Sequence, residues 1–229
     1  MKRLRPASVS GRGFTLVELL VVSSIIVILA ALTVPLVGRG LSNAHRMRCS
    51  SNLSQLARSV FLYADHNPRN PRQYLPPFPT LASDSDWVRA VTNFVADVNM
   101  REVLTCPARK LNRASLCYSG HPRLLGTTRG YRASDVPRTS AVILIGEGPQ
   151  ASGGGDAAKL YTAWDAAAGS AQSQADTPLP DHGADGVGGI VAWRHRVEGR
   201  PAANFAFADS HVETIPTNTL RYQNVAIGY

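Results

Sequence analysis

The chain has 229 residues and a formal net charge of +8. Residues 1–13 contain four of the basic residues and no acid, so the remainder carries only +4. That excess is small and scattered, and we therefore expect no nucleic-acid partner. Residues 67–229 are enough for one globular domain with its own core.

Residues 14–38 are mostly apolar and carry a single charge, the carboxylate of Glu18. A run of this length can cross a bilayer, and the basic residues before it favour a cytoplasmic N-terminus. A charge inside a membrane segment is costly and usually serves a function. A secretory signal peptide fits poorly, because residues 33–38 do not form a small-x-small cleavage site. A plain membrane anchor remains an alternative.

The sequence GFTLVEL at residues 13–19 resembles the prepilin cleavage and methylation signature of type IV pilins and type II secretion pseudopilins. The resemblance implies that a prepilin peptidase cuts after Gly13 and that Phe14 is then N-methylated. It places the family's glutamate at Glu18 and its helix-bending proline at Pro35. We expect Glu18 to pair with the freed α-amine of a neighbouring subunit, and Pro35 to kink or loosen the helix.

The helix is predicted to continue beyond the membrane. Cys49, Leu53, Leu56, Val60 and Tyr63 recur at spacings of four and three, which is typical of one apolar helix face. The sequence His-Asn-Pro at residues 66–68 should end the helix. A single helix over residues 14–66 would be roughly 75 Å long at 1.5 Å per residue. Its first part would be transmembrane and its second part amphipathic.

The remaining sequence predicts a small α+β domain. Five prolines in residues 67–79 indicate an extended loop, and residues 85–95 a short helix capped by Ser85 or Asp86. The other predicted elements are a buried strand at 142–145, an alanine-rich helix at 159–171, a loop at 176–189 and a hairpin of strands 204–207 and 212–215. We therefore expect a leader (1–13), a transmembrane and stalk helix (14–66) and a C-terminal domain (67–229). The fold class is α+β, with the long N-terminal helix packed on a small antiparallel sheet.

The C-terminal sequence resembles a motif of bacterial pseudopilin-like proteins, in which a histidine is followed after nine residues by Asp-Gly and commonly His-Val. Here thirteen residues separate His195 from Asp209, and Ser210 replaces the glycine. The wider gap predicts a longer loop around residues 197–201, and the serine must occupy a turn that favours positive φ. His195, Asp209 and His211 are suitable metal ligands, but they lack a recognisable zinc spacing. The alternative is structural, with Asp209 accepting hydrogen bonds from turn amides.

A second candidate metal site is the Gly- and Asp-rich loop containing Asp181 and Asp185. Calcium prefers such oxygen ligands, and the major pseudopilins of type II secretion bind it in a C-terminal loop. The sequence lacks the alternating acids of an EF-hand. We therefore expect no cofactor, with calcium as the alternative.

The three cysteines lie beyond the membrane segment, where disulfides can form. A Cys49–Cys106 bridge would attach the stalk helix to the domain. A Cys106–Cys117 bridge is equally allowed, and three buried thiols are the third possibility.

No nucleophile triad, phosphate-binding loop, CxxC pair or carboxylate pair stands out, so we do not expect an enzyme. The expected function is that of a structural subunit of a type II secretion pseudopilus or type IV-like filament. The resemblance implies four partners: prepilin peptidase, other pilin or pseudopilin subunits, an inner-membrane assembly platform and membrane lipid. It also implies a single-pass protein of the bacterial inner membrane, with a cytoplasmic N-terminus and a C-terminal domain that lies in the periplasm or in an envelope-spanning filament. The alternative is a membrane-tethered extracellular domain that binds DNA, a glycan or a secreted substrate.

Overall fold

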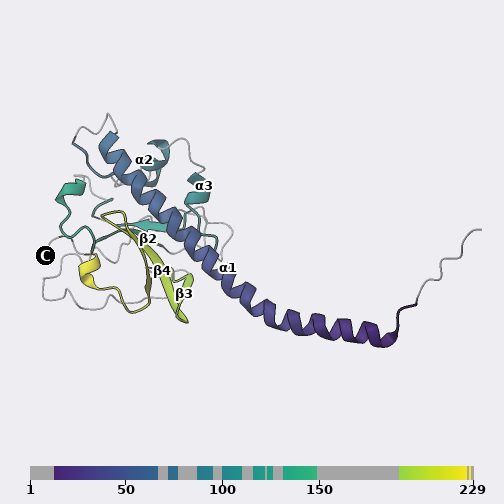
Figure 1. Cartoon of the computed structure of the whole chain (residues 1–229). Helices are drawn as coiled ribbons and strands as arrows, with labels where there is room; N and C mark the ends of the chain where they lie inside the picture. Colours follow the sequence, from purple (N-terminus) through teal and green to yellow (C-terminus); the bar gives the residue numbers. More distant parts are fainter. Residues whose placement is uncertain are drawn as a thin grey trace, which may run out of the picture. The chain divides into compact units, whose positions relative to one another are not determined.

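The structure is a computed structural model that describes residues 13–66, 72–76, 87–94, 100–109, 116–121, 123–125, 131–148, 191–225 and 227. The chain divides into two compact units, Met1–Leu41 and Ser42–Tyr229. One helix, α1 (Leu16–His66), contributes residues to both units (Figure 1). This confirms the predicted long N-terminal helix.

The N-terminal part of α1 is exposed throughout. Residues 13–44 are all exposed, although most of the side chains between Phe14 and Val37 are apolar. The helix continues through Pro35 and is long and apolar enough to cross a membrane. Because no described residue of this unit covers these side chains, we expect lipid or another protein to remove them from water.

The C-terminal part of α1 buries one face in the domain. Cys49, Leu53, Leu56 and Val60 are fully buried, as their spacing predicts. Tyr63, expected on the same stripe, is only half-buried. The next residue, Ala64, is buried in its place, so the buried face drifts round the helix toward its end.

The domain contains a five-stranded antiparallel sheet within its described residues, with the order β1-β2-β4-β3 and with β5 also paired to β4. The strands are β1 (Tyr118–Gly120), β2 (Ile143–Glu147), β3 (His195–Val197), β4 (Arg200–Phe207) and β5 (Val212–Pro216). This confirms the predicted α+β class with a small antiparallel sheet. It also confirms the predicted buried strand and the hairpin of β4 and β5 across residues 208–211.

Strands β2 and β3 lie end to end along the same side of β4. Ala202 pairs with both β3 and β5, and Ala206 pairs with both β2 and β5. Since a strand has only two pairing edges, β2 and β3 share the edge opposite β5. The last residue of β2, Glu147, and the first residue of β3, His195, therefore come together although 48 positions separate them.

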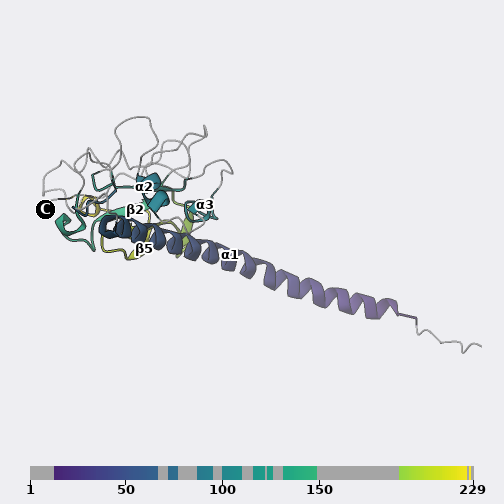
Figure 2. The same cartoon turned by 90° about the horizontal axis from the view of Figure 1, so that it is seen from above.

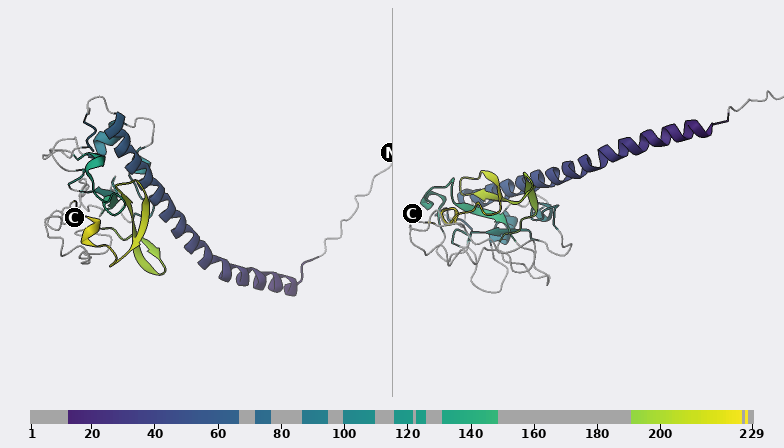
Figure 3. Two further views of the ribbon diagram at one scale, coloured as in Figure 1. Left: turned by 60° about the vertical axis from the view of Figure 1, so that its left-hand side comes forward. Right: turned by 90° about the horizontal axis from the view of Figure 1, so that it is seen from below.

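Each face of β4 packs against a different layer. Ala206 belongs to the core that includes the buried face of α1, whereas Ala203, Phe205 and Phe207 belong to a second core with C-terminal residues such as Leu220 and Val225. The strand alternation produces this division. Figure 2 and Figure 3 show the C-terminal part of α1 beside the yellow-green strands β3 to β5.

The expected long loop near residues 197–201 is wrong. Val197 pairs directly with Arg200, and a two-residue turn connects β3 to β4. Both turn residues, Glu198 (φ 51°) and Gly199 (φ 80°), have positive φ, as the tight turns that match strand twist require. The additional residues between His195 and Asp209 thus form a hairpin.

The other described elements are short. Helix α2 (Trp87–Phe94) confirms the helix predicted at 85–95, while the proposed caps Ser85 and Asp86 lie outside the described residues. The rest are α3 (Met100–Val103) and the 3₁₀ turns η1 (Ala133–Asp135) and η3 (Tyr222–Asn224). Within the proline-rich loop only residues 72–76 are described, and Tyr74 forms a bridge with Arg132. The predicted helix at 159–171 and the loop at 176–189 lie outside the described residues.

Candidate functional site

The N-terminal signature forms a capping box at the start of α1. The Thr15 backbone N–H and hydroxyl both donate to Glu18 Oε2, at 2.9 and 2.7 Å. The Glu18 backbone N–H donates to Thr15 Oγ1 at 3.2 Å. This arrangement satisfies backbone groups that the first helical turn leaves without partners. Glu18 therefore has a structural role in the isolated chain, in addition to the assembly role that the resemblance implies.

The residues around the expected cleavage point are accessible. Gly13 precedes the helix and is exposed, and a Cβ added there would meet nothing within 4 Å. Phe14 is 76% exposed. A peptidase can therefore reach this bond without unfolding any described part of the chain.

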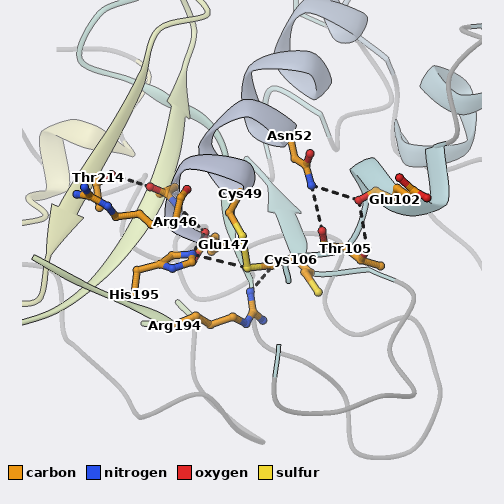
Figure 4. The surroundings of a disulfide bond; sticks show 12 residues. Arg46, Cys49, Asn52, Glu102, Thr105, Cys106, Glu147, Arg194, His195 and Thr214 are labelled. Carbon is orange, nitrogen blue, oxygen red and sulfur yellow. Dashed lines mark hydrogen bonds and ion pairs between the residues drawn. A yellow bond between two sulfur atoms is a disulfide. The ribbon is translucent and has the colours of Figure 1, made fainter. Parts of the chain in front are cut away.

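A buried polar cluster lies where α1 meets the sheet, and a disulfide is at its centre (Figure 4). Of the pairings left open by the sequence, the structure contains the Cys49–Cys106 bridge, with Cα atoms 5.3 Å apart. Cys117 is buried outside the bridge. The bridge attaches α1 to the segment after α3, and it closes a sequence separation of 57 residues.

Glu147 and His195 complete this cluster. His195 Nε2 lies 2.9 Å from Glu147 Oε1 and 3.6 Å from Cys106 Sγ. Glu147 is 0% exposed and His195 2% exposed. Because Glu147 Oε1 is the acceptor in this contact, Nε2 carries the hydrogen that the two atoms share.

Asn204 orients the carboxylate from the neighbouring strand. Its Nδ2 donates to Glu147 Oε1 at 2.8 Å and to the Arg46 carbonyl at 3.4 Å. Its Oδ1 accepts from Thr214 Oγ1 at 2.7 Å, which fixes which end of the amide faces Glu147. The other oxygen of the carboxylate, Oε2, is buried and has no hydrogen-bond partner among the described residues.

Neighbouring groups fix the chain around the cluster. Asn52 on α1 donates to the carbonyls of Glu102 and Thr105, at 3.2 and 3.0 Å, next to Cys106. Burial raises the pKa of Tyr118 well above its usual value, and the negative charge of Glu147 raises it further. Tyr118 therefore remains neutral over the accessible pH range.

His195, Asp209 and His211 do not form one site. Asp209 and His211 lie at the β4–β5 turn, where Asp209 Oδ1 accepts from the His211 backbone N–H at 3.1 Å and from its ring at 2.5 Å. Partial desolvation raises the pKa of Asp209, but the hydrogen bonds and charge of His211 outweigh it and leave that pKa lowered. Ser210 has the positive φ, 74°, expected at the missing glycine.

Sequence reasoning missed Glu147 and Asn204 as members of a site. Glu147 ends an apolar strand, so it is a lone acid in an apolar run, the same signal that singled out Glu18. Asn204 lies between Ala203 and Phe205 in a strand whose residues 202–207 are all buried. The calcium candidates Asp181 and Asp185 lie outside the described residues.

An open groove of about 640 Å³ runs between α1 and the β4–β5 turn. Its lining includes Arg46, Arg58 and His211, together with serines of α1. The lining is mostly polar and contains no acidic residue that could neutralise the two arginines.

Comparison with known proteins supports the N-terminal signature. A family model described as the prokaryotic N-terminal methylation motif matches residues 10–34, which include Gly13, Phe14 and Glu18. No curated protein and no solved structure was found to match the chain. Together with the α+β fold, the matched motif is consistent with a type IV pilin-like protein. It supports pilin-type processing and is consistent with single-pass membrane anchoring by α1.

Proposed function

We propose that the protein is a structural subunit of a type II secretion pseudopilus or a type IV-like filament. The observation that carries this proposal is the methylation motif at residues 10–34, positioned on a long exposed apolar helix. After cleavage behind Gly13 and methylation of Phe14, the apolar part of α1 would leave the inner membrane and pack against the same helix of other subunits. The assembly platform would supply new subunits, and the domain would face the periplasm. The protein would act as a building block and not as an enzyme.

The first test measures processing. The full chain is produced in bacterial cells with and without a prepilin peptidase, and the purified protein is analysed by N-terminal sequencing and intact mass. We expect a chain that begins at Phe14 and carries one extra methyl group, only when the peptidase is present. A chain that retains Met1, or one cut after the apolar run, would contradict the proposal.

Gly13→Leu and Gly40→Leu form a matched pair for this test. A Cβ at either glycine meets nothing within 4 Å, so neither change disturbs the packing of the domain. We expect Gly13→Leu to block cleavage and Gly40→Leu to be processed normally. Equal processing of the two variants would show that the peptidase does not recognise Gly13.

A second test separates the two roles of Glu18. Glu18→Gln keeps an oxygen that accepts from Thr15, since glutamine also serves in a capping box, but removes the charge. Thr15→Val removes the hydroxyl of the cap and keeps the charge. If Glu18 pairs with the α-amine of a neighbour, Glu18→Gln abolishes recovery in sheared filament fractions and Thr15→Val does not. The reverse result would mean that Glu18 acts only as a helix cap.

The alternative of a membrane-tethered binding domain is supported by the open groove with its arginines and serines. Such a domain would use pilin-type processing without forming the filament shaft. Quantitative mass spectrometry of sheared surface fractions distinguishes the two functions. A shaft subunit is abundant there together with other subunits, whereas a tethered domain stays in the membrane fraction.

A further inference from the structure

The buried cluster has the composition of a metal site. The ligand atoms of Cys49, Cys106, Glu147 and His195 all lie within 4.8 Å of one another, and all four residues are buried. Two thiolates, one imidazole and one carboxylate are four ligands of types that zinc accepts in tetrahedral sites. This set differs from the His195, Asp209 and His211 set that the sequence suggested.

The geometry favours a metal over a thiol-based catalytic site. His195 directs one and the same nitrogen, Nε2, at both Cys106 Sγ and Glu147 Oε1. In a catalytic Cys-His-Glu arrangement, one ring nitrogen of the histidine would bond to the thiol and the other to the carboxylate. Three ligand atoms that point toward one another are what a common metal ion requires.

The distances are close to those of a tetrahedral zinc site. Ordinary Zn–S and Zn–N bond lengths at a tetrahedral angle put the sulfur and nitrogen atoms about 3.6 Å apart. The separation of Cys106 Sγ and His195 Nε2 is 3.6 Å. The Glu147–His195 contact of 2.9 Å needs to widen by only about half an ångström to admit the ion. The larger movement is that of the two sulfurs, which must separate once the disulfide is reduced.

The surroundings also match a metal site. Asn204, itself held by Thr214, fixes the Glu147 carboxylate in the way that outer-shell partners orient metal ligands. Glu147 Oε2 is buried without a partner among the described residues, and such an oxygen calls for an ion or another donor. The Arg194 guanidinium lies beside the cluster and adds positive charge next to the anionic ligands (Figure 4).

We propose that the dithiol form of Cys49 and Cys106 binds one zinc ion together with His195 and Glu147, and that the disulfide is the metal-free state of the same site. A thiol or phosphine reductant supplies two electrons, and two protons convert the disulfide to two thiols. Zinc then displaces both thiol protons, while His195 moves its hydrogen to Nδ1 and binds through Nε2. Either state attaches α1 to the segment after α3, so the stalk helix remains tied to the domain in both. The proposal does not depend on filament assembly.

The test uses the full chain in detergent, reduced with a phosphine and titrated anaerobically with Co²⁺, whose absorption reports thiolate ligation and tetrahedral geometry. We expect one Co²⁺ per chain, a thiolate-to-metal band, and displacement by Zn²⁺. The oxidised protein should show no such band. Absence of the band in the reduced protein would overturn the proposal.

Variants locate the site. Cys49→Ser should abolish the thiolate band or strongly reduce it, whereas Cys117→Ser, at the buried cysteine outside the bridge, should leave it unchanged. Asn204→Ala should weaken the affinity by about 10- to 100-fold through the carboxylate that it orients. An unchanged band in Cys49→Ser, or loss of the band in Cys117→Ser alone, would refute the assignment.

A second measurement needs no variant and is insensitive to misfolding of mutants. The reduced wild-type chain is alkylated with and without Zn²⁺, and the modified cysteines are mapped by mass spectrometry. Zinc should slow alkylation of Cys49 and Cys106 at least about tenfold relative to Cys117, which serves as internal control. Equal slowing of all three cysteines would indicate general tightening of the fold and contradict the site.

Discussion

The two parts of α1 differ in what covers their apolar side chains. From residue 13 to residue 44 every residue is exposed, including leucines such as Leu36, which is 63% exposed. From Cys49 onward one face is buried, and Leu53 is 0% exposed. The same helix geometry therefore serves two purposes. An apolar surface on all sides suits lipid or a bundle of like helices, whereas a single apolar stripe suits the core of one domain.

The contrast extends to the two lone glutamates. Glu18 is exposed and bonds within its own helical turn, to Thr15. Glu147 is buried and bonds to His195 and Asn204, which are 48 and 57 positions away. A lone acid in an apolar run thus marks a local cap in one region and a tertiary cluster in the other. Substitutions in matched pairs can test this difference.

The largest effect is expected for Glu147→Ala. Removing one member of a buried pair leaves His195 and Asn204 without their acceptor, and we expect a loss of about 4 kcal/mol in unfolding free energy. The control is Glu102→Ala, whose 3.4 Å ion pair with Arg48 is exposed and contributes less than about 1 kcal/mol. Urea unfolding of the oxidised chain in detergent, followed by the fluorescence of buried Trp87, measures both. A Glu147 effect as small as that of Glu102 would contradict the cluster.

Leu53→Ala and Leu36→Ala compare the two parts of α1 directly. Truncating buried Leu53 removes core packing and leaves a cavity, which should cost about 3 kcal/mol. Truncating exposed Leu36 should change the unfolding free energy of the domain by less than about 0.5 kcal/mol. The same urea titration measures the unfolding free energy of both variants. Equal losses would mean that the apolar part of α1 contributes to the stability of the domain.

Two glycines provide the next comparison. A Cβ at Gly120 would lie 2.8 Å from Leu125 Cδ1 and 2.9 Å from Trp87 Nε1, so Gly120→Ala should cost about 2 kcal/mol. Gly40→Ala meets nothing within 4 Å and should strengthen the helix by up to about 1 kcal/mol. Circular dichroism during urea unfolding reports both changes. If Gly120→Ala does not lower the unfolding free energy, the side chains of Leu125 and Trp87 can move aside without cost.

The smallest effect concerns the pH dependence of Asp209→Asn. The lowered pKa of Asp209 means that its ionised form contributes stability above the unfolded pKa of about 3.9, and that this contribution is lost as pH falls through the folded value. The variant should therefore be less stable than the wild type at about pH 6 and equal to it at about pH 2. Unfolding midpoints at the two pH values provide the measurement. A difference that grows as the pH falls would have the wrong sign.

Local patterns were sufficient to predict the long elements. The spacing from Cys49 to Val60 predicted the buried face of α1, and apolar runs beside turn residues predicted β2 and the β4–β5 hairpin. Strands β1 and β3 have three residues each, which is too short for an alternating pattern to be recognised. The two-residue turn at Glu198 and Gly199 was mistaken for a longer loop because the motif spacing alone was considered.

The candidate sites divide in the same way. The N-terminal signature is contiguous in sequence, so residues 13–19 were sufficient to recognise it. The buried cluster depends on β2 and β3 meeting along one edge of β4, and no local pattern reports that pairing. Glu147 was missed because it lies two residues beyond the strand predicted at 142–145, so the sequence did not place it in the sheet. The pairing of Cys49 with Cys106 likewise required the packing of α1 on the domain.

The end-to-end placement of β2 and β3 has a consequence for how this domain can diversify. The Ala192 N–H donates to the Glu147 carbonyl at 3.0 Å, so the chain leaves and re-enters the sheet at one point. The free-energy cost of closing such a segment rises by only about 0.6 kcal/mol for each doubling of its length. The number of residues that join these two strands can therefore vary at little cost in closure free energy, as long as Glu147 and Ala192 keep their hydrogen bond.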